Sequence, residues 1–235
     1  MINVKEFLAE HTVIDDTATK CADCGRRKSK FVLNFYQDTG STSGPSCIYC
    51  LLLWYTDIDN FCEKIDQPRN ELVTEVYADG GLLAMNRIGG VFAWCGVTAS
   101  GHRVMSERAC VLETKLKQPV TNNHTEEIAI IRALEAMPEK WSGKVYSDSN
   151  VALFRVFWNG GSKNRPWIIE ERAKNAVKRL GKLEPKLLQG HPTETDLIVG
   201  IGERRGIQVS IHNHFCDIQC ELEKKEFFEA NKELT

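Results

Sequence analysis

Four acidic residues, spread along the last two thirds of the chain, have the chemistry needed to hold divalent metal ions. In chain order they are Asp79, Glu126, Asp148 and Asp217. Mg²⁺ prefers carboxylates, waters and phosphate oxygens as ligands. Catalysis by two such ions, about 4 Å apart, requires carboxylates that converge from distant parts of the chain on a phosphodiester. The four acids therefore indicate metal-dependent phosphodiester chemistry, provided that the fold brings them together.

Two of the acids are predicted at strand ends. Apolar and polar residues alternate over 71–78 and are followed by two glycines, so a strand is expected to end at Asp79. A shorter strand over 143–148 ends at Asp148, before an apolar periodic segment that begins a helix. Ends of adjacent central strands are where open α/β sheets place their sites.

The other two acids are predicted on helices. Apolar residues recur with helical spacing over 124–137, which places Glu126 in the first turn of a helix. Asp217 is predicted to open a last helix over about 214–230. Taken singly, each of the acids also fits an ordinary structural role, as a turn residue, a partner of a helix dipole or a helix cap.

In order and in context, the acids resemble the motifs of type 1 ribonuclease H over residues 72–232. The matching segments are Tyr77-Ala78-Asp79-Gly80-Gly81, Thr121-Asn122-Asn123-His124-Thr125-Glu126, Tyr146-Ser147-Asp148-Ser149, and Gly190-His191 followed by Asp217. One motif alone is weak evidence, whereas four in family order are specific. The resemblance implies an endonuclease that cuts the RNA strand of RNA–DNA hybrids and leaves 5′-phosphates.

The same resemblance implies roles for individual residues. The four acids would hold two Mg²⁺, with Mn²⁺ as a possible substitute, and His191 would move protons or help product release from a mobile loop. Asn122 and Asn150 would contact 2′-hydroxyls in the minor groove, because an amide both donates and accepts. Gly80 and Thr121 would also contact substrate, Thr121 through a backbone phosphate. Helix capping is the alternative role for Asn122 and its neighbour Asn123.

The spacing between the last histidine and the last aspartate departs from the family pattern. His191 and Asp217 are 26 positions apart, whereas the family usually has about ten. The inserted stretch, residues 193–213, contains three glycines and is interpreted as a mobile lid or substrate loop. Asp196 and Glu203 within it compete with Asp217 as the fourth ligand.

Cysteines in the N-terminal part indicate a second kind of metal site. Cys21 and Cys24 form one Cys-x-x-Cys pair, and Cys47 and Cys50 form another. Two such pairs predict a tetrahedral structural Zn²⁺ site with Zn–S distances of about 2.3 Å. A disulfide framework and a redox pair are the alternatives. Because the N-terminus does not resemble a signal peptide, disulfides are disfavoured and a reducing, cytoplasmic or other intracellular compartment is expected.

Basic residues next to aromatic residues occur in two places. Residues 26–30 are basic and precede Phe31, Phe35 and Tyr36, which could bind nucleic acid or could form a small core around the zinc. Residues 160–182 hold seven Lys or Arg, with Trp158 and Trp167 near the start. The family resemblance implies that this second region binds the DNA strand of the hybrid. The alternative is a solvated helix whose tryptophans lie in the core.

Composition and element order complete the predicted organisation. The chain has 235 residues, a net charge of −2 and 42% hydrophobic residues, which is ordinary for a globular protein and argues against a strong nonspecific polyanion binder. We predict a zinc module over 1–66 and an α/β domain over 67–235. Strands at 72–78, 90–99, 103–113, 143–148 and 184–189 predict a mixed five-stranded sheet with helices on both faces. No membrane-spanning stretch is expected.

Two other functions stay open on the sequence alone. The first is a catalytically silent nucleic-acid-binding protein on the same fold, which intact acids at all four positions disfavour. The second is a nuclease of this fold acting on another nucleic acid, which the Thr121-Asn122-Asn123 motif disfavours. Protein partners, oligomeric state and cleavage-site preference are not encoded in any recognisable motif.

Overall fold

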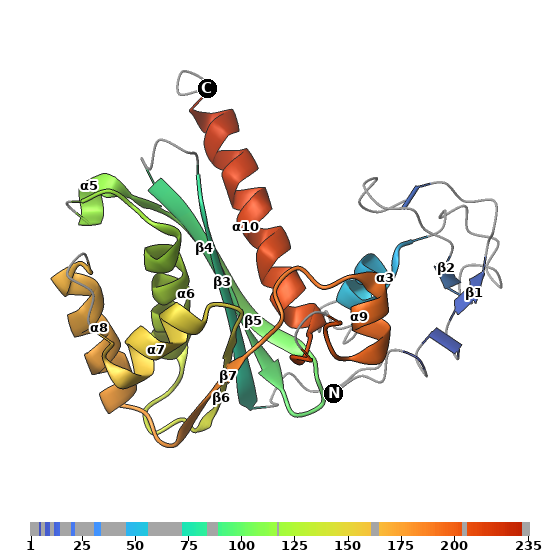
Figure 1. Cartoon of the computed structure of the whole chain (residues 1–235), viewed down its shortest axis with the longest axis horizontal. Coiled ribbons are helices and arrows are strands. Elements are labelled where there is room, and N and C mark those ends of the chain that lie inside the picture. The colour runs from blue at the N-terminus through green and yellow to red at the C-terminus, as the bar shows by residue number, and fades with distance from the viewer. Residues whose placement is uncertain are drawn as a thin grey trace.

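The computed structural model describes most of the chain from Leu72 onward and separate pieces before it. The described residues are 5, 8–9, 12–14, 20–21, 31–33, 46–55, 72–83, 89–116, 118–160, 165–203 and 206–231. The elements of the larger part are β3 (Val73–Leu82), β4 (Gly89–Thr98), β5 (Arg103–Leu112), α5 (Glu113–Leu116), α6 (Asn122–Ala136), β6 (Gly143–Ser147), α7 (Asn150–Trp158), α8 (Trp167–Lys178), β7 (Leu183–Leu187), α9 (Glu194–Val199) and α10 (Ile211–Ala230). Figure 1 shows them built around one twisted sheet.

The sheet has five strands in the order β5–β4–β3–β6–β7. The first three strands of the chain's larger part pair antiparallel, as hairpin-connected neighbours do, whereas β6 lies parallel to both β3 and β7. The predicted mixed five-stranded sheet is therefore confirmed. Apart from the end of β3, the strands begin and end within two residues of the predicted positions.

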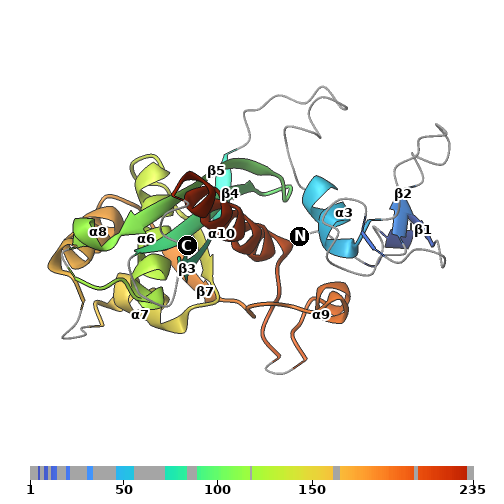
Figure 2. The same ribbon diagram turned by 90° about the horizontal axis from the view of Figure 1, so that it is seen from above.

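Helices cover both faces of the sheet because successive strand residues point to opposite sides. Val76 and Ala78 of β3 pack in the core shared with α6, α7 and α8. Tyr77, between them, faces the other way and packs with Cys216 and Cys220 of α10. Figures 1 and 2 show α10 across one face of the sheet and the α6–α8 group on the other.

Strand β3 does not end at Asp79, contrary to the sequence prediction. It continues through Gly80 and Gly81 to Leu82, paired with β4 along its length. Gly80 serves close packing rather than a turn. A Cβ on Gly80 would lie 2.5 Å from the backbone N of Glu126, so only glycine lets α6 lie directly against this strand.

Two helices begin earlier than predicted because their caps lie further upstream. Helix α6 begins at Asn122, with Thr121 as its N-cap, and the Thr121 hydroxyl accepts a hydrogen bond from the His124 N–H at 3.3 Å. Helix α10 begins at Ile211 with Ser210 as its N-cap. Glu126 and Asp217 therefore lie in the second turns of their helices rather than in the first turns.

A buried ion cluster joins α6 to the helices that follow it. Glu127 of α6 is fully buried and forms ion pairs of 2.7 Å with both Arg155 of α7 and Arg165, which precedes α8. Arg165 is itself 1% exposed at its side chain. One carboxylate thus holds two guanidinium groups in the interior, and this fixes α7 and α8 against α6.

In the N-terminal part, two short strands pair with each other and a helix follows them in the chain. Strands β1 (Thr12–Ile14) and β2 (Phe31–Leu33) pair antiparallel, and α3 spans Ile48–Tyr55. The predicted boundary at 64–71, the basic run at 26–30, Cys24 and Cys62 lie outside the described residues.

Residues 193–213, predicted to be a loop, contain regular structure instead. Thr193 caps α9 in a capping box with Asp196, whose carboxylate accepts N–H groups from Thr193 at 2.9 Å and from Glu203 at 2.8 Å. Ile201 and Gln208 then form an antiparallel bridge that closes the segment. We call residues 193–210 the insertion. Asp196 is committed to capping, so it does not compete with Asp217 for the metal site.

The insertion packs against the N-terminal part rather than lying free over the sheet. Leu197, Val209 and Ile211 form one buried apolar cluster with residues of the N-terminal part, which are Cys21, Cys47, Ile48, Leu51 and Leu52. Figure 1 shows α3 next to α9 and the first turn of α10. None of the described helices is both long and apolar enough to cross a membrane.

Candidate metal-binding active site

Asp79 and Asp148 occupy equivalent positions on adjacent parallel strands. Tyr77 of β3 is in register with Tyr146 of β6, and their rings stack with centroids 4.6 Å apart. Each aspartate lies two residues beyond its tyrosine, so both carboxylates emerge at the same edge of the sheet. Asp79 is 8% exposed, and its Oδ1 accepts the Gly80 N–H at 2.7 Å.

The segment after β7 closes on Asp148. Any Cβ on Gly190 would collide with Asp148 Oδ2, so glycine is needed for this close approach. His191 follows with a φ of 47°, a left-handed backbone conformation in which histidine is several-fold enriched over most other residues. Its side chain is 82% exposed, so the imidazole can reach solvent and a bound substrate.

Glu126 is brought to the same edge by α6. The helix lies against the glycine of β3, as described above, and the Asn122 side chain donates to Glu126 Oε1 at 2.6 Å. The Ser149 side chain, next to Asp148, acts to lower the pKa of Glu126. Glu126 is therefore held by Asn122 of its own helix and influenced by the segment that follows β6.

Asp217 reaches the site from α10. Two histidines lie close to its Oδ2, namely His191 and His214, each with its Nδ1 at 3.8 Å. Asn213, one turn before Asp217, acts through its side chain to lower the pKa of Asp148. The structure thus brings the four predicted acids and His191 together, in spite of the insertion between His191 and Asp217.

Three polar residues of the site were not predicted from the sequence. They are Ser149 and Asn213, whose side chains act to lower the pKa values of Glu126 and Asp148 respectively, and His214, which lies beside Asp217. The sequence signal that could have indicated the last two is their spacing, since Asn213 and Asp217 are four residues apart on one helical face. That signal is readable only once α10 is known to begin at Ile211.

Each negatively charged carboxylate at this edge of the sheet makes ionisation of its neighbours less favourable. Burial raises the pKa of Asp79 well above its usual range, and the charges of Asp148 and Asp217 raise it further. Burial likewise raises the pKa of Glu126 to about 7. It also raises the pKa of Asp148, although the charge of His191 acts in the opposite direction. Close burial of several carboxylates requires either bound protons or a compensating positive charge.

The residues present fit a divalent cation. Within the described part of the chain, no Lys or Arg forms an ion pair with Asp79, Glu126 or Asp148. Oxygen ligands with excess negative charge are the donor set that Mg²⁺ prefers. The ligand oxygens are more widely spaced than the cysteine sulfurs described below, since no three of these acids have carboxylate oxygens that all lie within 4.8 Å of one another.

Protons and Mg²⁺ should compete for this site. A carboxyl whose pKa is raised by folding stabilises the folded state fully below its unfolded pKa, about 4.5 for glutamate, and loses that contribution as the pH rises through its folded pKa. For Glu126 the loss occurs as the pH rises through about 7. We therefore expect Mg²⁺ to raise the melting temperature clearly more at about pH 8 than at about pH 5.5.

The measurement is thermal unfolding at both pH values with and without added Mg²⁺, in the absence of chelators, which would also remove zinc. Glu126→Gln is the control and should flatten the pH dependence of the Mg²⁺-free protein. An equal gain in melting temperature at both pH values would contradict the expectation.

The predicted substrate residues surround the acids. Asn150 is exposed at the first position of α7. Asn122 is also exposed, but it does not cap its helix, because Thr121 does. Thr121 is partly exposed at the N-terminus of α6, where N–H groups are available to an anion.

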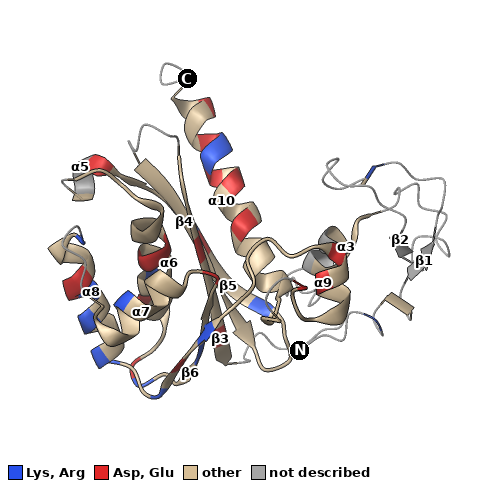
Figure 3. Cartoon of the chain, in the orientation of Figure 1, with Lys and Arg blue, Asp and Glu red and all other residues tan. Residues whose placement is uncertain are grey.

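An exposed aromatic surface lies on α7 and α8. Phe154, Trp158 and Trp167 are 55%, 60% and 72% exposed, so the alternative that both tryptophans lie in the core is wrong. Figure 3 shows basic residues along α8. Some of them are paired within the protein, since Arg172 bonds Glu135 and Lys174 bonds Glu170.

Three of the four predicted zinc cysteines lie together. The sulfur atoms of Cys21, Cys47 and Cys50 all lie within 4.8 Å of one another, and no other group of three metal-binding side chains in the described residues meets this criterion. The Cys47 N–H donates to Cys21 Sγ at 3.2 Å, as in a metal knuckle. No disulfide links the described cysteines. The donor set fits a thiophilic ion such as Zn²⁺.

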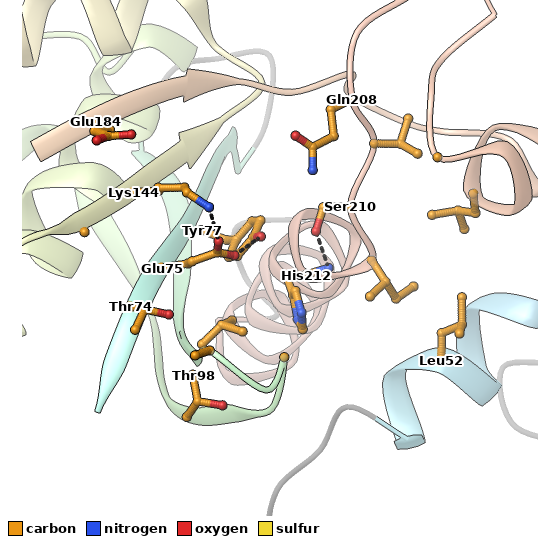
Figure 4. A pocket seen from close by; sticks show the side chains of 18 of the residues that line it. Leu52, Thr74, Glu75, Tyr77, Thr98, Lys144, Glu184, Gln208, Ser210 and His212 are labelled. Carbon is orange, nitrogen blue, oxygen red and sulfur yellow. Dashed lines mark hydrogen bonds and ion pairs between the residues drawn. The ribbon is translucent and has the colours of Figure 1, made fainter. Parts of the chain in front are cut away.

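A cavity of about 640 Å³ separates the sheet from the N-terminal helix. Tyr77, Thr98 and Lys144 line it on the sheet side, and Leu52 of α3 lines it on the other. Figure 4 shows Ser210 and His212, at the start of α10, between the two sides. Lys144 is paired with Glu75 at 2.9 Å, and α3 contacts the catalytic part through the insertion and α10.

No protein-family model matches the chain. A curated relative, the "Ribonuclease H" of Methylobacillus flagellatus, is 32% identical over 126 residues, which are 52% of this chain and 76% of the relative. Given the sheet order and the converging acids, this places the chain among the nucleases built on such a sheet. The chain belongs to the ribonuclease H family.

Similar solved structures include two ribonucleases H1. One is from the archaeon Halobacterium salinarum, with a TM-score of 0.48 and 15% identity, covering 65% of this chain and 97% of that one. The other is LC11-RNase H1 in complex with an RNA/DNA hybrid, with a TM-score of 0.44 and 18% identity, covering 66% of this chain and 98% of that one.

Proposed function

We propose that this chain is an endonuclease that hydrolyses the RNA strand of RNA–DNA hybrids with two bound Mg²⁺ ions. The observation that carries the proposal is the meeting of Asp79, Glu126, Asp148 and Asp217 at one edge of the sheet, with raised pKa values at the first three. Membership of the ribonuclease H family supports the same activity. When bound, the metals would lower the pKa of the attacking water and stabilise the leaving 3′ oxygen.

Each part of the site would have its own task. The two aspartates from adjacent strands would supply fixed ligands, and Glu126, which accepts a hydrogen bond from Asn122, would supply one from α6. Asp217 would complete the ligand set from α10. His191 would move protons or assist product release, because its exposed imidazole lies beside Asp217 and histidine is a common proton carrier in catalysis.

Substrate contacts would extend from the acids along both neighbouring helices. Asn122 and Asn150 would bond 2′-hydroxyls, which both donate and accept. Gly80 and Thr121 would approach the cleaved strand, Thr121 through a phosphate at the N-terminus of α6. Trp158 and Trp167, exposed beside the basic face of α8, would contact the DNA strand.

One assay tests the proposed activity. The purified chain is incubated with labelled RNA–DNA hybrid, double-stranded RNA or double-stranded DNA, each with Mg²⁺, Mn²⁺ or no divalent metal. We expect cleavage of the hybrid alone, in its RNA strand, leaving 5′-phosphates, and only with metal. Cleavage of another duplex would identify a nuclease with a different substrate. Binding without cleavage would identify a catalytically silent protein of this fold.

The proposal extends to the N-terminal part, which we assign as a zinc module over 1–66, distinct from a catalytic domain over 67–235. Cys21, Cys47 and Cys50 would supply three of the ligands. Cys24, by its Cys-x-x-Cys spacing, would supply the fourth.

Zinc content is directly measurable. We expect the protein purified without chelators to carry about one Zn²⁺ per chain, and Cys47→Ser to carry none, because the site needs all four thiolates. Elemental analysis of both proteins measures this, with Cys110→Ser, outside the cluster, as the control that keeps its zinc. Purified wild-type protein without zinc would contradict the assignment.

A further inference from the structure

The zinc module touches the part of the chain that carries His191 and Asp217. Ile48, Leu51 and Leu52 of α3 are almost completely buried, in the same apolar cluster as Leu197 of α9 and Val209 and Ile211 at the start of α10. Cys21 and Cys47 belong to this cluster as well. The metal ligands and the docking residues are therefore neighbours on one short segment.

The insertion is fixed at both ends to elements of the active site. The insertion begins shortly after Gly190 and His191, and Gly190 lies against Asp148. At its return, the Gln189 N–H donates to the Gln208 carbonyl at 2.9 Å, and the Val209 N–H donates to the Gly200 carbonyl at 3.2 Å. The end of the insertion is thus hydrogen-bonded to Gln189, which follows β7 and directly precedes Gly190 and His191.

Helix α10 connects the apolar cluster around α3 with the acidic residues of the site. Ile211, docked near α3, is the first residue of α10. Asn213 and His214 are buried in the first turn of α10, and His214 Nδ1 lies 3.8 Å from Asp217 Oδ2 within the next turn. Because an α-helix is a rigid rod over this length, a displacement of its first turn moves these three side chains together.

We propose that the zinc module is a positioning element for the catalytic site: the metal holds α3, and α3 holds the insertion and the first turn of α10 where His191 and Asp217 can act. This inference rests on the proposed zinc site and nuclease activity. It differs from a substrate-binding role for the module, because the contacts that carry it are apolar and internal. Among the described residues, α3 packs against the insertion and the start of α10, and a cavity of about 640 Å³ lies between α3 and the sheet, so the insertion and α10 are the proposed route of coupling.

The chain offers a matched pair of variants on one helix. Leu197 of α9 is 3% exposed in the cluster, whereas Val199, two residues later, is 65% exposed. Leu197→Ser should weaken the packing of α9 on α3 and replaces no metal ligand. Val199→Ser makes a similar substitution at a position that is exposed to solvent. Cys47→Ser removes the metal itself. All are made in the full chain.

Three measurements are made on each protein: zinc content, hydrogen exchange of peptides from 194–220, and kcat and KM on the hybrid. We expect Leu197→Ser to keep its zinc, yet to exchange at least about tenfold faster in this region. Its kcat should fall about tenfold or more with KM nearly unchanged, since a misplacement of about 1 Å can cost about 100-fold. Cys47→Ser should show the same changes without zinc, and Val199→Ser none of them.

Two results would overturn the inference. One is a Leu197→Ser protein with wild-type exchange and kcat, and the other is a pair of variants in which KM alone rises, which would make the module a substrate-binding accessory. If the wild-type chain does not cleave the hybrid, the proposed function fails, while the exchange of 194–220 in the zinc-loaded and zinc-free proteins still decides whether the module positions α10.

Discussion

Asp79→Asn should abolish cleavage of an RNA–DNA hybrid, with a loss of at least about 10³-fold in kcat. The substitution keeps the volume of the side chain but removes the most buried carboxylate of the site, which neighbours Asp148 and Asp217. An amide cannot offer the charge that the cation needs. Asp148→Asn, at the equivalent position of the adjacent strand, should have the same effect.

A loss of cleavage activity must be distinguished from misfolding. The direction of the change in melting temperature makes this distinction. Since burial and neighbouring charges raise the pKa of Asp79, its ionised form destabilises the Mg²⁺-free protein, so Asp79→Asn should melt at a higher temperature than wild type near neutral pH. Glu75→Gln, on the same strand but paired with Lys144, is the control that should retain cleavage. Activity of Asp79→Asn within about tenfold of wild type would exclude Asp79 as an essential ligand.

Glu127→Gln should destabilise the catalytic part by about 3–5 kcal/mol, although Glu127 takes no part in the proposed chemistry. The residue follows Glu126 on α6, and its carboxylate is enclosed between Arg155 and Arg165. The amide would leave two guanidinium groups without a counter-charge, one of them almost fully buried. The remaining nitrogens of Arg165 have no other hydrogen-bond partner among the described residues.

Urea unfolding followed by circular dichroism measures this effect. Glu135→Gln is the matched control, because Glu135 lies on the same helix and also pairs with two arginines, but is 29% exposed at its side chain. Its loss should cost at most about 1 kcal/mol. Equal costs for the two substitutions would show that burial of the ion cluster contributes nothing to stability.

The sequence predicted the sheet well, because its strands are locally encoded, whereas the expectation that the four acids meet came from their order and from the family resemblance. Period-two alternation marks β3, and cap residues mark the start of α7 after Asp148. The errors arose where one residue type serves two purposes. Gly80 and Gly81 predicted a turn, but Gly80 permits contact with α6 within a continuing strand. The local sequence does not distinguish these uses of glycine.

The insertion shows the limit of local information. Its glycines suggested a mobile loop, although Thr193 and Asp196 carry the spacing of a capping box. The insertion is positioned by its packing against α3, a segment far away in the chain. No sequence pattern predicts that Leu197 and Leu52 belong to the same cluster. Asn213 and His214 were missed for a related reason, since their roles depend on where α10 begins.

The contact between α3 and the insertion also bears on how the chain is made. Synthesis proceeds from the N-terminus, so the apolar side of α3 leaves the ribosome long before residues 197–211 exist to cover it. The five-stranded sheet can assemble in the meantime from β3 to β7. The cluster around Ile48 and Leu52 is then the last part of the core to close, and a nascent chain stalled before Leu197 would present that surface to chaperones.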